Sequence, residues 1–306
     1  MEAFVFPGQG SQYSGMGKEL VDNFNVAKLV FEEANDALGF DIAKLCFAGS
    51  DEDLKLTANT QPAILTTSIA ALRVVQTETN LTPAYVAGHS LGEYSALVAA
   101  GVIDFSVAVK IVRQRGTFMQ EAVPVGIGAM AAVLGIDANE LDKLCQEASQ
   151  GEVVTPANFN SPGQIVIAGH TTAVERAIVL AKERGAKRAM LLPVSAPFHS
   201  SLMAPAAQRL QEVLAEITVA PPAFPVVSNV EAQPCQDEAL IKDLLVQQVC
   251  APVRWDESIV TMKELGVDGY IEIGPGRVLS SLIKRIDRPA SLKNICDVAS
   301  LKKLQK

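Results

Sequence analysis

The alternation of short apolar runs with stretches of helical periodicity predicts an α/β protein at the start of the chain. The runs "AFVF" (residues 3–6) and "AYVAG" (residues 84–88) are typical of buried strands, and glycine follows or ends each of them. Apolar positions spaced three and four apart predict helices at residues 17–39, 61–75, 90–101 and 104–122. This order of elements favours a parallel sheet covered by helices.

A different order of elements begins near Val125 and predicts a small inserted domain. Residues 125–196 show the pattern β-α-β-β-α-β, with a turn at Asn160-Ser161-Pro162-Gly163 between the two central strands. That order is typical of a ferredoxin-like fold. The α/β pattern then resumes, so we expect one large α/β domain built from residues 1–124 and 197–306, with a site in the cleft between the two domains.

Composition and charge narrow the classes of protein. Of 306 residues, 49% are hydrophobic and 20% are charged, as in a folded globular protein. A net charge of −8 argues against nucleic acid and against a membrane surface, and no apolar run approaches the ~18 residues of a membrane span. Five scattered cysteines, without a CxxC pair, indicate reduced thiols and no zinc site. We therefore expect a cytoplasmic protein without a bound metal.

The segment "GHSLG" matches the G-x-S-x-G pattern of a nucleophile elbow. Gly88 and Gly92 would permit the sharp strand-to-helix turn that exposes the hydroxyl of Ser90. A predicted strand precedes the motif and a predicted helix follows it, which is the context that an elbow requires. On the motif alone, an N-cap role for Ser90 stays open.

A serine nucleophile needs a base, and the chain has three histidines. His89 is next to Ser90 on a tight turn and should point away from it. His170 opens a predicted helix in the inserted domain, where a capping or surface role is expected. His199, in "SAPFHS", lies where the chain returns to the large domain, and we favour it as the base.

No carboxylate partner for His199 can be chosen from the sequence. Acidic residues between Ser90 and His199, such as Asp137, Asp142 and Glu175, fall on the predicted outer faces of helices. A backbone carbonyl or an amide side chain could hold the imidazole instead. The expected arrangement is a Ser/His dyad.

A glycine-rich turn, "FPGQGSQ", follows the first predicted strand and lacks both the Walker lysine and the G-x-G-x-x-G spacing. The N–H groups of Gln9 and Leu91 could form an oxyanion hole if the first strand lies beside the strand before Ser90. A plain surface turn is the alternative. Arg113 and Arg115 are two residues apart on a predicted helix, so they point in different directions, and the pattern does not choose between them.

Six segments together identify a family resemblance. They are "FPGQGSQ", "GHSLGEYSAL", "RGTFMQEAVP", "NSPGQIVIAG", "SAPFHS" and "EIGPGRVLSSLIKR". With these segments in order from residue 3 to residue 285, the chain resembles the malonyl-CoA:acyl carrier protein transacylase family. The resemblance implies a hydrolase-like large domain with a ferredoxin-like insert, as the element pattern suggests.

The resemblance also implies roles for individual residues. Ser90 would be the acylated nucleophile, His199 its base, and Gln9 and Leu91 the oxyanion hole. Arg115 would bind the substrate carboxylate, and Met119 and Asn160 would contact the substrate. Phe198 would select unbranched malonyl groups, and the main-chain carbonyl of Gln248 would orient the histidine.

The expected function is malonyl transfer from malonyl-CoA to the phosphopantetheine thiol of acyl carrier protein in fatty acid biosynthesis, by a monomer that needs no cofactor. The alternatives are a trans-acting acyltransferase of a polyketide synthase, a serine thioesterase or other hydrolase, and a docking subunit without activity. For the acidic carrier protein, the basic run at residues 182–188, with Lys110 and Arg113, is a candidate docking patch. A solvated helix end is the alternative interpretation of that run.

Overall fold

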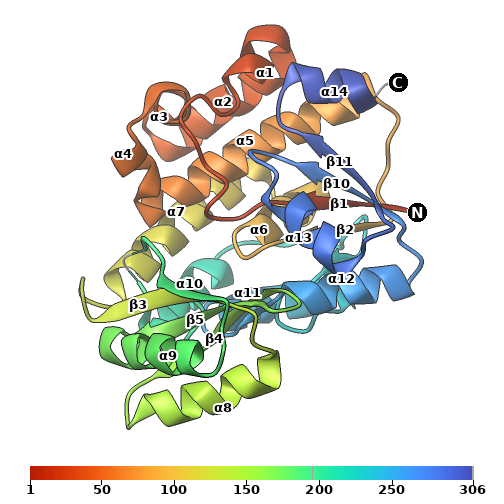
Figure 1. Cartoon of the computed structure of the whole chain (residues 1–306). Coiled ribbons are helices and arrows are strands. Elements are labelled where there is room, and N and C mark those ends of the chain that lie inside the picture. Colours follow the sequence, from red (N-terminus) through yellow and green to blue (C-terminus); the bar gives the residue numbers. More distant parts are fainter. Residues whose placement is uncertain (195, 305–306) are drawn as a thin grey trace.

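The computed structural model describes residues 1–194 and 196–304. Ser195, the first residue of the "SAPFHS" segment, lies outside the described residues, as do residues 305–306 of the predicted large domain. The described chain is organised around two sheets (Figure 1). A six-stranded sheet has the order β11-β10-β1-β2-β7-β8, and a five-stranded sheet has the order β6-β3-β5-β4-β9.

The six-stranded sheet is parallel except for its last strand. Its members are β1 (Glu2–Phe6), β2 (Tyr85–Gly88), β7 (Val226–Val227), β8 (Pro234–Cys235), β10 (Gly269–Ile273) and β11 (Ser291–Ile295), with β8 antiparallel to β7. Phe6 pairs with Gly88, so β1 and β2 end side by side. The loops that follow these two strands are therefore neighbours, as the predicted oxyanion hole requires.

Helices cover both faces of this sheet. They are α1 (Lys18–Asn23), α2 (Asn25–Leu38), α3 (Ile42–Ala48), α4 (Asp51–Lys55), α5 (Thr57–Glu78), α6 (Gly92–Ala99), α7 (Phe105–Glu121), α10 (Ala204–Ala215), α11 (Glu238–Gln248), α12 (Trp255–Glu264), α13 (Val278–Ile286) and α14 (Val298–Leu304), with a 3-10 turn at Ser201–Met203 before α10. Alternate residues of β1 serve two cores: Phe4 and Phe6 pack towards α5, whereas Ala3 and Val5 pack towards α12 and α13.

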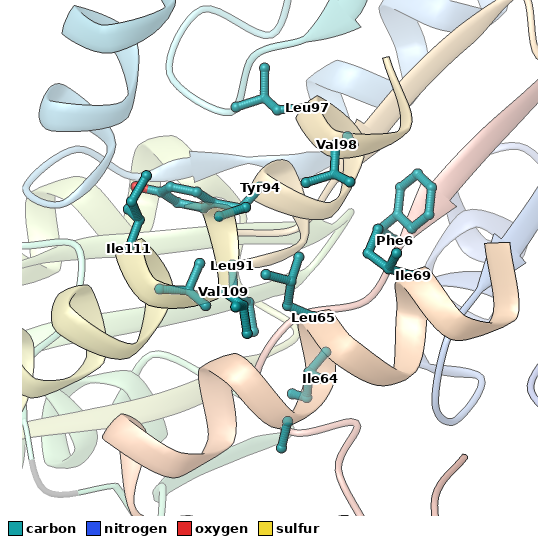
Figure 2. Close-up of a cluster of buried hydrophobic side chains, with 14 of the residues drawn as sticks. Phe6, Ile64, Leu65, Ile69, Leu91, Tyr94, Leu97, Val98, Val109 and Ile111 are labelled. Atoms are coloured by element: carbon teal, nitrogen blue, oxygen red, sulfur yellow. The ribbon is translucent and has the colours of Figure 1, made fainter. Parts of the chain in front are cut away.

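The core beside the serine motif is built from β1, α5, α6 and α7. Figure 2 shows Phe6 and Ile69 close together, with Leu65 and Leu91 near the start of α6. Full burial of one such side chain contributes about 1.5–3 kcal/mol, so this cluster makes the base of the serine turn rigid.

The five-stranded sheet comes mainly from the middle of the chain. Its strands are β3 (Gly128–Leu134), β4 (Val154–Ser161), β5 (Gln164–His170), β6 (Arg188–Leu191) and β9 (Val253–Arg254), and its helices are α8 (Ala138–Ser149) and α9 (Thr171–Glu183). The predicted order β-α-β-β-α-β is present between β3 and β6. The two helices pack on the sheet over a separate apolar core, in the lower part of Figure 1. Strand β9 joins β4 in parallel and ties this sheet to the later part of the chain.

Two details differ from the sequence prediction. The single helix predicted over residues 17–39 is two helices, because Phe24 adopts an extended backbone (φ −131°, ψ 119°) and packs its ring against the core. Helix α5 begins at Thr57 and not at residue 61 as predicted, so Pro62 lies inside it. After α13 the chain continues into β11 and α14. Within residues 1–194 and 196–304, no helix is long and apolar enough to cross a membrane.

Candidate active site

Ser90 occupies a strained turn between β2 and α6. Its backbone is left-handed, with φ of +51°, a conformation that costs a non-glycine residue about 1–3 kcal/mol. A Cβ atom on Gly88 would lie 1.9 Å from the carbonyl carbon of Gly92, so the turn needs glycine at that position. The strain and the close backbone packing are those of a nucleophile elbow. Ser90 is not the N-cap of α6: Leu91 occupies that position, and no side chain caps the helix.

The His199 ring is held between Ser90 and a main-chain carbonyl. Its Nε2 atom lies 2.8 Å from Ser90 Oγ, and its Nδ1 atom lies 2.8 Å from the Gln248 carbonyl oxygen and 3.2 Å from that of Ala251. Because a carbonyl can only accept, Nδ1 carries the proton and donates it. Nε2 is then free to accept the Ser90 hydroxyl proton, so the two residues form a dyad.

Burial keeps His199 neutral. Only 4% of the residue is exposed, and this desolvation, together with the positive charge of Arg115, lowers the pKa of His199 to about 3. The two carbonyl contacts oppose that shift and do not overcome it. The ring is therefore in its basic form at neutral pH, as a general base must be.

The glycine-rich loop after β1 lies against the serine turn. A Cβ atom on Gly8 would lie 2.3 Å from the carbonyl oxygen of His89, so only glycine permits this approach. Among the described residues, the backbone N–H groups of Gln9 and Leu91 have no hydrogen-bond partner. The Ser90 N–H, by contrast, donates to Asn229 Oδ1 at 2.6 Å. Two free N–H donors thus remain beside the nucleophile, and both residues line its cavity.

Arg115 lies at the nucleophile. It is 1% exposed, and its guanidinium donates to Gln61 Oε1 (2.8 Å), Gln248 Oε1 (2.9 Å) and Ser90 Oγ (3.3 Å). Its Nε atom is buried and has no partner among the described residues. Burial lowers the pKa of Arg115, yet a guanidinium remains charged in proteins. A buried cation that contacts only neutral groups can bind an anionic one.

The neighbouring arginine points elsewhere. Arg113 donates to Asn59 Oδ1 and stacks over the ring of Phe40, 5.1 Å from its centroid. In the basic run at residues 182–188, Arg184 forms ion pairs with glutamates of α8. Two members of the candidate docking patch therefore already have partners within the chain.

A cavity of about 120 Å³ opens beside Ser90. It is lined by Gln9, Gln61, His89, Ser90, Leu91, Arg115, Met119, Met130, Asn158, Leu192, Val194, Phe198 and His199. Arg115 and Gln61 contribute polar groups to this lining, and Met119, Met130 and Phe198 contribute apolar ones. A short acyl group with a charged end suits this lining.

Asn160 does not line this cavity. Its Oδ1 atom lies 2.8 Å from His89 Nε2, so it holds the ring of the residue before the nucleophile, and burial lowers the pKa of that histidine. Asn158, two residues earlier on the same strand, lines the cavity instead. The interpretation of His89 as a structural residue agrees with this contact.

Two residues that the sequence analysis missed support the turn. Asn229 accepts the Ser90 N–H and donates Nδ2–H to the Gly88 carbonyl at 2.7 Å. Glu93 Oε2 accepts from the Asn229 N–H and from Gln248 Nε2. A carboxylate in the otherwise apolar segment "EYSALVAA" was a signal for Glu93, because glutamate is rarely buried without partners. Over the described part of the chain, no three His, Cys, Asp or Glu side chains gather to hold a metal ion.

The parallel sheet, the strained serine and the neutral histidine together define an α/β enzyme of the serine acyl-transfer class. The sequence profile of the acyl transferase domain matches residues 3–306. The chain therefore has the acyl transferase domain, and its curated relatives show that it belongs to the malonyl CoA-acyl carrier protein transacylase family.

The relatives are similar over nearly their whole length. The malonyl CoA-acyl carrier protein transacylase of Escherichia coli strain K12 is 53% identical over 284 residues, which cover 93% of this chain and 92% of the relative. That of Bacillus subtilis strain 168 is 53% identical over 287 residues, covering 94% and 90%.

Two solved structures are similar in fold. The crystal structure of an acyl carrier protein S-malonyltransferase from Vibrio cholerae gives a TM-score of 0.97 at 51% identity and covers 99% of each chain. A malonyl-transacylase solved in complex with its type II polyketide acyl carrier protein gives 0.97 at 50% identity, covering 99% of this chain and 98% of that one.

Proposed function

We propose that this enzyme transfers the malonyl group from malonyl-CoA to the phosphopantetheine thiol of acyl carrier protein through a malonyl-Ser90 intermediate, in fatty acid biosynthesis. The observation that carries the proposal is the pair of contacts at the nucleophile. His199 Nε2 lies 2.8 Å from Ser90 Oγ, and the buried Arg115 guanidinium lies 3.3 Å from the same oxygen. The names of the curated relatives support the same reaction.

In the first half-reaction, His199 Nε2 takes the hydroxyl proton as Ser90 Oγ attacks the thioester carbonyl carbon. The N–H groups of Gln9 and Leu91 donate to the oxyanion that forms. As the tetrahedral intermediate collapses, the carbon–sulfur bond breaks and the imidazolium returns its proton to the CoA sulfur. No metal or cofactor takes part in this scheme.

The malonyl carboxylate would be bound by Arg115. In the free enzyme, Gln61 and Gln248 offer it neutral amide oxygens, while its Nε–H has no partner. A carboxylate would add a charge-assisted hydrogen bond at this Nε–H. Met119 would contact the acyl chain, and the bulk of Phe198 would exclude a branched one. Asn160 would act through His89 and not on the substrate.

In the second half-reaction, the pantetheine thiol gives its proton to His199 and attacks the malonyl-Ser90 carbonyl. The carbon–oxygen bond to Ser90 then breaks, and His199 returns the proton to Oγ. The Gln248 carbonyl holds Nδ1–H throughout, so the same tautomer serves both half-reactions.

We also propose the division into a hydrolase-like domain of residues 1–124 and 197–306 and a ferredoxin-like domain of residues 125–196. The order β6-β3-β5-β4 in the small sheet supports it, as does a cavity lined from both parts, by Met130 and Asn158 of one and by Ser90 and His199 of the other. We expect a monomer in the cytoplasm, where reducing conditions suit five unpaired cysteines.

The function is tested by incubating the enzyme with malonyl-CoA and phosphopantetheinylated acyl carrier protein and separating malonyl-carrier from free malonate. The proposal predicts carrier-bound malonyl as the main product and none with Ser90→Ala. Free malonate as the main product would indicate the hydrolase, and a wild type without turnover would indicate a docking subunit.

A further inference from the structure

Glu93 is a buried carboxylate that the reaction scheme does not use. It lies in the first turn of α6, three residues after the nucleophile, and is 3% exposed. A carboxylate at such a depth is costly unless hydrogen bonds hold it. Its surroundings therefore indicate what it does.

The Oε2 atom of Glu93 joins the main chain of Asn229 to the side-chain amide of Gln248, and both of these residues hold the backbone of Ser90. It accepts from the main-chain N–H of Asn229 at 3.0 Å and from Gln248 Nε2 at 2.8 Å. Asn229 Oδ1 accepts the Ser90 N–H, and Gln248 Nε2 donates to the Ser90 carbonyl at 3.0 Å. Both main-chain groups of the strained serine are thus fixed by residues that contact one carboxylate oxygen.

Glu93 also sets which way the Gln248 amide faces. Only the amino end of an amide can donate to a carboxylate oxygen, so Gln248 Oε1 is turned towards Arg115, from which it accepts at 2.9 Å. Burial raises the pKa of Glu93 to about 7, and Oε2 can accept both hydrogen bonds whether or not the other oxygen carries a proton. The main-chain carbonyl of Gln248 meanwhile holds His199.

We propose that Glu93 is a positioning residue: through Asn229 and Gln248 it fixes the Ser90 turn and the Arg115 guanidinium in one arrangement, and so contributes to selectivity for an acyl group with a carboxylate. The inference rests on the proposed function. It makes a prediction that a purely structural carboxylate would not, namely that changing Glu93 alters the preference for malonyl over acetyl groups.

The test compares Glu93→Asp with a matched control, Glu272→Asp. Glu272 is also a buried carboxylate, 0% exposed, and its oxygens accept from the N–H groups of Leu279 and Ser280 at the start of α13. Single-turnover acylation of Ser90 is followed by intact mass, with malonyl-CoA and acetyl-CoA in parallel, and thermal unfolding is recorded for each variant.

We expect Glu93→Asp to acylate with malonyl-CoA at least about tenfold more slowly, because a displacement of 1 Å at a catalytic site can cost that much or more. Its malonyl-to-acetyl rate ratio should fall. Glu93→Gln should keep the malonyl acylation rate and the malonyl-to-acetyl ratio close to those of the wild type, since its amide oxygen can accept the same two hydrogen bonds. Glu272→Asp should lower the melting temperature and leave the ratio unchanged.

An unchanged ratio in folded Glu93→Asp, or an equal loss with both substrates, would overturn the proposal. If Glu93→Asp does not fold, Gln248→Met provides the test, because it removes the amide contact with Arg115 and keeps the main-chain carbonyl. An unchanged malonyl-to-acetyl rate ratio in Gln248→Met would also contradict the proposal. If the wild-type enzyme formed no malonyl adduct, the result would instead contradict the proposed function.

Discussion

Replacing Arg115 with alanine removes a buried guanidinium that lies 3.3 Å from the Ser90 hydroxyl. The change withdraws three hydrogen-bond donations and leaves the oxygens of Gln61 and Gln248 without their donors. It also removes a positive charge that lowers the pKa of His199. The effect on malonyl transfer must therefore be separated from a general effect on the dyad.

The magnitude follows from what a carboxylate gains at this site. The guanidinium donates to neutral amide oxygens and has an unpartnered Nε–H, so a bound carboxylate adds one hydrogen bond between charged groups. A hydrogen bond to a charged group contributes about 1.5–3 kcal/mol. At 1.36 kcal/mol for each factor of ten, Arg115→Ala should lower the malonyl-to-acetyl ratio of kcat/KM by about 10- to 150-fold.

The assay measures kcat/KM for transfer to the carrier protein with malonyl-CoA and with acetyl-CoA. Because both substrates use the same Ser90 and His199, their ratio cancels any change in the dyad. Arg113→Ala is the matched control, since Arg113 is on the same helix but contacts Asn59 and Phe40. It should leave the ratio unchanged. An equal loss of both activities in Arg115→Ala would refute the carboxylate-binding role.

Three further predictions follow from the site. Because burial holds the pKa of His199 near 3, single-turnover acylation should stay level as pH falls through 6.5, and a loss centred there would contradict a neutral buried base. Phe198→Ala should raise kcat/KM for methylmalonyl-CoA relative to malonyl-CoA; an unchanged ratio would show that Phe198 does not limit branching. Gly8→Ala should slow acylation on the order of a hundredfold, because its Cβ would displace the oxyanion loop from His89, and wild-type rates would argue against that loop.

The parts of the site that are local in sequence could be predicted. A strand, a G-x-S-x-G turn and a helix follow one another within a few residues, so the position of Ser90 depends on short-range geometry. The choice of His199 relied on its place at the return from the inserted segment, and the structure brings its ring within 2.8 Å of Ser90. The nearness of the Gln9 loop depended on β1 pairing with β2, which it does.

The supporting contacts could not be predicted, because they join distant parts of the chain. Asn229 holds the Ser90 N–H across 139 positions, and no periodicity identifies which of many asparagines does so. Asn160 and Asn158 lie close together on one strand, where a bulge in the pairing with β5 decides which of them reaches the cavity. The break at Phe24 likewise comes from packing, since the apolar spacing continues through it.

The most direct test of the account is intact mass spectrometry of the enzyme with malonyl-CoA, followed by addition of phosphopantetheinylated acyl carrier protein. We predict a mass gain of one malonyl group that maps to the peptide containing Ser90, is absent from Ser90→Ala, and moves to the carrier when it is added. An adduct on another residue, or one released only as free malonate at the same rate with and without the carrier, would contradict the account.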